Sequence, residues 1–152
     1  MIKLHTILKL SALIFLLSAC SKADHIMKSS QAICDTKQCP TIAFKINEKT
    51  KALSLFIDVE NDDSEIEQVD LVLNGQQNVF KLSDENVENS NTGKSTYLVL
   101  NVKKDLVDSL VSADNSSISI KTKNGTFTGV IRNGQQDSEL YKAAKEFKSN
   151  LN

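Results

Sequence analysis

Apolar and polar residues alternate along several short stretches of the chain, which is the pattern of half-buried β-strands. The first two alternating stretches, 41–46 and 52–59, are joined by the polar segment 47–51. This arrangement predicts a β-hairpin. Further strands are predicted by the apolar positions of residues 69–73, 79–82, 96–102, 118–120 and 127–131.

Three Asn-Gly pairs mark the ends of predicted strands. They are Asn74-Gly75, Asn124-Gly125 and Asn133-Gly134. Asn-Gly is favoured in tight turns, because both residues tolerate positive φ. The pairs therefore predict turns, and the polar stretches 60–65 and 83–94 predict exposed loops.

The hydrophobic period changes to that of a helix in two places. Apolar residues within 106–111 recur at i, i+1, i+4 and i+5, which predicts a short amphipathic helix. A second helix is predicted to begin near Asp137 or Ser138, either of which can cap exposed amides. Its apolar stripe is expected to pack on the sheet, with membrane-surface binding as the alternative; the stripe is formed by Leu140, Ala144, Phe147 and Leu151.

These elements together predict the fold class. About seven antiparallel strands, one short helix and a C-terminal helix are typical of a mainly β domain, either β-sandwich-like or α+β. No internal repeat accompanies them. We expect a single domain over 34–152, preceded by a flexible polar tether over 20–33.

The first nineteen residues have a different character. Lys3 and Lys9 precede the apolar run Leu10–Leu17, and no acidic residue occurs before Asp24. A spanning helix needs about 20 apolar residues, so this run is too short to be one. Positive charge, a short apolar block and small residues in that order predict a secretory signal peptide over 1–19.

The end of this signal, Leu17-Ser18-Ala19-Cys20, resembles the lipobox of bacterial lipoprotein precursors. The resemblance implies that Cys20 becomes the first residue and carries a diacylglyceryl thioether, with further acylation such as palmitate. Two acyl chains suffice for stable anchoring. Ser21, in place of an Asp, implies the outer membrane, and leaves the periplasmic or surface face open. An ordinary signal peptide that ends beside a cysteine is the alternative.

Lipidation of Cys20 leaves Cys34 and Cys39 among the three cysteines. Exported proteins meet an oxidising compartment such as the periplasm, so we expect a structural disulfide between these two residues. The four intervening residues do not fit the two-residue spacing of a thioredoxin-like redox site. Zinc would need further ligands.

The C-terminal half resembles, at the level of pattern, proteins of the invasion-associated locus B family. The matching elements are 106–111 (LVDSLV), 118–120 (ISI) and 141–144 (YKAA). The tryptophan and further cysteines associated with that family are missing here. The resemblance therefore implies an order of elements and no function.

Composition and charge argue against two classes of function. The formal net charge is −1, and it becomes more negative when Lys3 and Lys9 leave with the signal. No basic excess or abundance of aromatic residues favours binding to nucleic acid. The only histidines are His5 and His25, in the signal and the tether, so the expected domain lacks the usual general base. We expect no catalytic residues, no enzyme activity and no cofactor.

Acidic residues are densest where the second strand leads into the first loop. Asp58, Glu60, Asp62 and Asp63 alternate oxygen ligands as calcium would require, but the glycine at the sixth position of an EF-hand loop is missing. A solvated acidic loop is the simpler interpretation, and these four residues are weak calcium candidates.

The combined features predict a lipid-anchored envelope protein with a non-catalytic domain. The first hypothesis is an interaction module that binds another envelope protein, for instance at a strand edge. The alternatives are a lipoprotein that binds calcium or a small ligand, and a surface-exposed lipoprotein that contacts a host.

Overall fold

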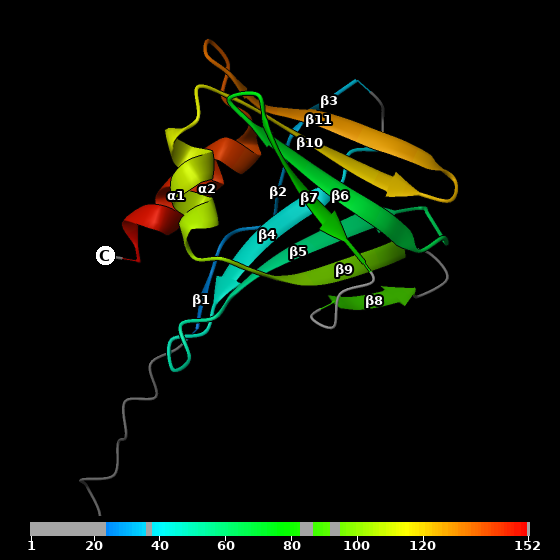
Figure 1. The fold of residues 1–152 in the computed structure, drawn as a ribbon, viewed down its shortest axis with the longest axis horizontal. Coiled ribbons are helices and arrows are strands. Elements are labelled where there is room, and N and C mark those ends of the chain that lie inside the picture. Colours follow the sequence, from blue (N-terminus) through cyan, green and yellow to red (C-terminus); the bar gives the residue numbers. More distant parts are fainter. Residues whose placement is uncertain (1–23, 36–37, 83–86, 92–94, 152) are drawn as a thin grey trace, which may run out of the picture.

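The computed structural model describes residues 24–35, 38–82, 87–91 and 95–151. It confirms a mainly β protein, with 52% strand and 17% helix, built from two antiparallel sheets and two helices (Figure 1). The predicted signal peptide 1–19 and the lipidation site Cys20 lie outside the described residues. Within the described part, no helix is long and apolar enough to cross a membrane.

The first sheet has the strand order β1-β4-β5-β9-β8, and β2 also pairs with β4. Every pairing in it is antiparallel. Its strands are β1 (His25–Ile26), β2 (Ser30–Gln31), β4 (Thr41–Ile46), β5 (Leu53–Glu60), β8 (Val87–Asn91) and β9 (Ser95–Val102).

The second sheet has the order β3-β11-β10-β6-β7, so that β3 and β7 are its two edges. It is antiparallel throughout. Its strands are β3 (Ile33–Cys34), β6 (Ile66–Leu73), β7 (Gln76–Lys81), β10 (Asn115–Thr122) and β11 (Gly125–Asn133).

The core is formed by the inward-facing apolar side chains of both sheets. On β5, Leu55, Ile57 and Val59 are buried while the intervening residues are only partly so. The same alternation on β6 buries Val69 and Leu71. The period of two seen in the sequence is therefore the period of burial, because successive side chains point to opposite faces of a strand.

Two helices, α1 (Asp105–Ser112) and α2 (Glu139–Ser149), lie against each other at one end of the sheets (Figure 1). The Ser138 hydroxyl caps α2 by accepting from the Tyr141 N–H at 3.1 Å, as expected for one of the two predicted capping residues. Phe147 stacks on Phe44 of β4 with 6.3 Å between ring centroids. The expectation that the α2 stripe packs on the sheet is confirmed.

The predicted turns are confirmed. The first hairpin joins β4 to β5, and Asn74-Gly75 joins β6 to β7 with φ values of 49° and 82°. Gly134 also has a positive φ, of 80°, where the chain leaves β11 toward α2. Thr122 pairs with Gly125 across the β10–β11 turn.

The structure differs from the expectation of a flexible tether over 20–33. Residues 25–34 contribute β1, β2 and β3, and Met27 is 2% exposed in the core. The Met27 N–H donates to the Phe44 carbonyl at 2.8 Å. Strands of two residues are too short to show an alternating pattern, so hydrophobic periodicity does not predict them.

The structure also differs over the predicted loop 83–94, because residues 87–91 form β8 at the edge of the first sheet. The sequence VENSN of β8 has no apolar alternation. It is a strand through its backbone pairing with β9, from Val87 opposite Leu100 to Asn91 opposite Thr96.

The predicted disulfide is present, and joins Cys34 to Cys39 with 5.7 Å between their Cα atoms. It lies where β3 pairs with β11, with Cys34 opposite Gly129. A Cβ atom on Gly129 would lie 2.6 Å from the Cβ of Ala32 and 3.0 Å from the Cys34 sulfur. The close approach of this segment to β11 therefore requires glycine at this position.

Candidate binding groove

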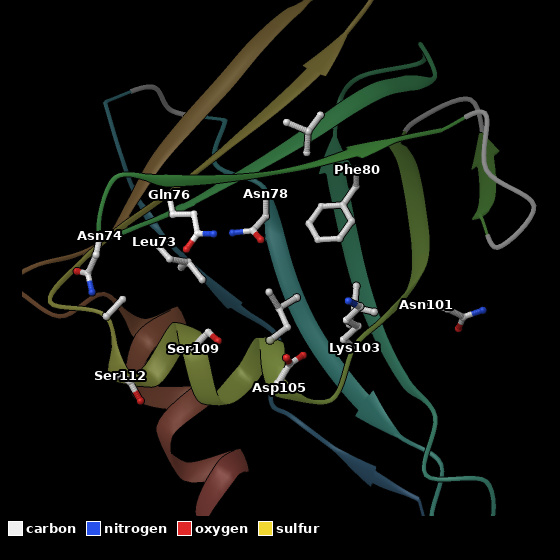
Figure 2. A pocket seen from close by; sticks show the side chains of 14 residues that line it. Leu73, Asn74, Gln76, Asn78, Phe80, Asn101, Lys103, Asp105, Ser109 and Ser112 are labelled. Atoms are coloured by element: carbon white, nitrogen blue, oxygen red, sulfur yellow. The ribbon is translucent and has the colours of Figure 1, made fainter.

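A groove of about 780 Å³ opens between β7 and α1, where the C-terminal end of β9 closes one side (Figure 2). Its volume lies within the range of about 300–1,000 Å³ that is usual for ligand sites. Gln76, Asn78 and Phe80 extend from β7 toward α1 (Figure 2). Ser109 and Asp105 lie on the opposite wall.

The register of β6 and β7 explains why the groove is polar. Leu71 and Leu73 of β6 are buried, and their cross-strand partners on β7 are Asn78 and Gln76. Residues directly opposite each other project from the same face of a sheet. The edge strand thus has amide side chains at positions where its neighbour has core leucines.

These two amides are available for binding. Gln76 is exposed, and Asn78 is partly buried. The Asn78 amide donates only a long bond of 3.4 Å, to the Leu71 carbonyl. An amide side chain carries two donors and an acceptor with two lone pairs, so most of its capacity is open to a ligand.

One end of the groove is fixed by Asn74 at the β6–β7 turn. Its side-chain oxygen accepts from the N–H groups of Asp114 at 3.0 Å and Asn115 at 3.1 Å, and its own N–H donates to the Asn115 carbonyl at 2.7 Å. The turn that begins β7 is therefore tied to the loop that follows α1. Two walls of the groove are held at a set separation.

The charged side chains at the groove are Lys103 and Asp105, at the start of α1. Both are exposed, and the described residues show no ion pair for either. The lining is otherwise made of amides, hydroxyls and apolar side chains. This combination suits a chain that forms hydrogen bonds with the amides and places apolar groups against side chains such as Phe80.

The four calcium candidates are not gathered into a metal site. Within the described residues, no cluster of three or more His, Cys, Asp or Glu side chains is placed to hold a metal ion. Asp58 and Glu60 lie on β5, and Asp62 and Asp63 lie in the loop that follows. The oxygens of Asp62, the most buried of the four, are already engaged by neutral donors.

Asp62 connects the β5–β6 loop to the β10–β11 turn. One oxygen accepts from the Ser64 N–H at 2.8 Å and the Asn124 amide at 2.8 Å, and the other accepts from the Thr122 hydroxyl at 2.7 Å. Burial alone raises the pKa of this carboxyl, but the hydrogen bonds outweigh it and hold the pKa below its ordinary value. The predicted solvated acidic loop thus has a structural carboxylate at its centre.

His25 lies in β1 and is not part of the groove. Its Nε2 is 3.3 Å from a carboxylate oxygen of Glu48, which also pairs with Lys51.

The sequence does not predict that the residues of the groove form a binding site. The available signal was Gln76 and Asn78 at alternate positions directly after the Asn74-Gly75 turn, but the predicted strand begins only at residue 79, whereas β7 begins at Gln76.

Comparison of the chain with protein-family models, with curated proteins and with solved structures finds no match. The likenesses to bacterial lipoprotein precursors and to the invasion-associated locus B family therefore rest on the residues that suggested them.

Proposed function

We propose that this protein is a lipid-anchored lipoprotein of the bacterial outer membrane whose folded domain binds an extended segment of another envelope protein at β7. The segment pairs with the free edge of β7, and its alternate side chains enter the groove beside α1. The anchor at Cys20 holds the domain at the membrane, and the binding requires no catalysis.

The observation that carries this proposal is the amide-lined edge strand. Among the described residues β7 pairs with β6 alone, so its other edge offers unpaired backbone groups. An exposed edge of this kind is a template for strand addition, in which backbone hydrogen bonds give affinity and side-chain pockets give specificity. The six residues of β7 match a partner strand of about the same length.

The composition of the groove suits a partner that presents both polar and apolar side chains. Gln76 and Asn78 supply donors and acceptors along the strand, and Ser109 supplies a hydroxyl from the opposite wall. The apolar part of the lining comes from Phe80 near the end of β7 and from Leu73, Val79, Val102, Leu106 and Ala113. A segment that alternates polar with apolar side chains fits this lining.

A small polar ligand is the second candidate, because the groove volume also suits one. It would use the same amides without the edge of β7. Native mass spectrometry of the protein purified from its own cells separates the two ideas. A retained small mass that disappears in a groove-filling variant would favour the ligand.

The partner hypothesis is tested by photo-crosslinking in intact cells. A photoreactive amino acid replaces Gln76 in the groove, and a matched one replaces Thr128, which is exposed on β11. We expect a defined protein adduct from position 76 and none from position 128. The same adduct from both positions, or none from either, would contradict binding at β7.

A second pair of variants shows that the groove itself is required. Ser109→Phe places a ring in the groove from an exposed position of α1, so it leaves the core unchanged. Lys145→Phe adds the same ring to an exposed position of α2, outside the groove. We expect the position-76 adduct to be lost with the first substitution and retained with the second.

A further inference from the structure

A second hollow, of about 260 Å³, lies on the outer face of the first sheet, away from the β7 groove. Asp58 of β5 stands in a cross-strand row between Thr41 of β4 and Tyr97 of β9. Phe56, two residues before Asp58, projects from the same face. Ser29 and Ser95 complete the polar part of the rim.

The carboxylate of Asp58 has no donor. No hydrogen bond or ion pair engages it within the described part of the chain, and its Oδ1 is buried without a hydrogen-bond partner. No lysine or arginine is among the residues that line the hollow. A partly buried carboxylate without donors is costly, and a charged donor compensates it best.

Two aromatic residues, Phe56 and Tyr97, line the hollow together with this carboxylate. Tyr97, opposite Asp58, is 38% exposed and is one of three large hydrophobic side chains that are exposed among the described residues. Phe56 is half-buried against the core. The face of an aromatic ring attracts a cation, and the attraction increases when the cation is partly desolvated.

We infer that this hollow binds a guanidinium group. Its planar face stacks on Tyr97 while its N–H groups donate to the Asp58 carboxylate. Guanidinium fits better than ammonium, because it is weakly hydrated, stacks on rings and presents several donors in one plane. The group can belong to a free small molecule or to an arginine side chain of a protein.

The inference is tested with two probes that differ in charge but have almost the same shape. N-acetyl-arginine methylamide carries the guanidinium, and the citrulline analogue carries a neutral urea of the same outline. Each is titrated into the purified protein while NMR follows the Tyr97 ring and the Asp58 amide. We expect saturable shifts at both residues with the arginine probe, and binding at least about tenfold weaker with citrulline.

Variants assign the effect to the carboxylate. Asp58→Asn keeps the shape and removes the charge, and should weaken binding of the arginine probe about tenfold. Asp70→Asn makes the same change on the outer face of the other sheet and should leave binding unchanged. The dispersion of the amide spectrum shows that each variant is folded, so that a loss of binding can be assigned to the site.

Several outcomes would overturn the inference. These are equal binding of the two probes, an unchanged affinity in Asp58→Asn, or shifts confined to residues outside the hollow.

The source of the guanidinium group is identified by a longer peptide that contains arginine. If this peptide binds much more tightly than the single residue, the source is a protein. Equal affinity of peptide and residue would identify it as a small molecule. None of these results depends on the β7 groove.

Discussion

At the residue scale, Gly129 shows how a single missing side chain allows two segments to meet. The chain before Cys34 runs so close to β11 that any Cβ at position 129 would overlap Ala32 and touch the disulfide. The sequence placed Gly129 in the middle of a predicted strand, where glycine often marks a close approach of another backbone. The segment that approaches Gly129 contains Ala32, which is almost a hundred residues earlier in the chain.

We expect Gly129→Ala to lower the free energy of unfolding by about 1–3 kcal/mol, because the added methyl group forces β3 and β11 apart. Urea denaturation followed by circular dichroism measures this change. Thr128→Ala, at the exposed neighbouring position, is the control and should have little effect. Equal stability of the two variants would show that the segment adjusts without cost.

Asp62 leads to a second expectation at this scale, through pH. Because its pKa in the folded protein is below the ordinary 3.8, its contribution to stability is present above that value and is lost as the pH falls through the folded pKa. Asp62→Asn should cost about 1–3 kcal/mol at neutral pH, since a buried acceptor of several donors is altered. It should also flatten the loss of stability below about pH 4.

Denaturation at a series of pH values tests this expectation. Glu65→Gln, which removes a carboxylate from an exposed position of the same loop, provides the comparison. A pH dependence that is the same in both variants and in the unchanged protein would show that another group controls acid stability.

At the scale of elements, the sequence predicts those strands and helices that are stabilised by the burial of an apolar face. The strands β4, β5, β6 and β9 and both helices bury one face, and their periodicity showed it. The edge strand β8 is held by backbone pairing, and a polar sequence cannot reveal that. The groove stayed hidden for a related reason, since only the register with β6 shows that Gln76 and Asn78 face inward.

We expect the N-terminal segment to contribute to stability through the buried side chain of Met27. Met27 and Ile26 are adjacent, but Met27 is 2% exposed and Ile26 is 67% exposed. Met27→Ala should lower the free energy of unfolding by about 2–5 kcal/mol through the cavity it leaves, while Ile26→Ala should change it little. Thermal unfolding of the two variants measures the difference. Two unaffected proteins would mean that residues 25–31 are a tether after all.

At the scale of the whole molecule, the domain consists of two antiparallel sheets, and the described part of the chain begins at Asp24, directly before β1. Only a few residues then separate Cys20 from the first described strand. An anchor at Cys20 would hold β1 near the lipid surface. The domain would therefore stand close to the membrane, with little freedom to move along it independently of its anchor.

The anchor has its own test. Cys20→Ala removes the thiol that would carry the lipid, so the protein should move from the detergent phase to the aqueous phase when detergent extracts are separated. Each buried methylene contributes about 0.8 kcal/mol to membrane attachment, and the loss of two or more chains should make this shift nearly complete. Ser21→Ala keeps the thiol and should stay in the detergent phase. Unchanged partitioning of Cys20→Ala would refute lipidation.

The hydrogen bonds of the Asn74 side chain affect how fast a partner can bind in the groove. Because one amide joins the turn before β7 to the loop after α1, the groove already has its shape before anything enters it. Little ordering then remains to be done on binding. The association rate of a partner strand would then be limited by diffusion and orientation, and not by a slow rearrangement of the groove. Differences in affinity would arise mainly from the lifetime of the complex.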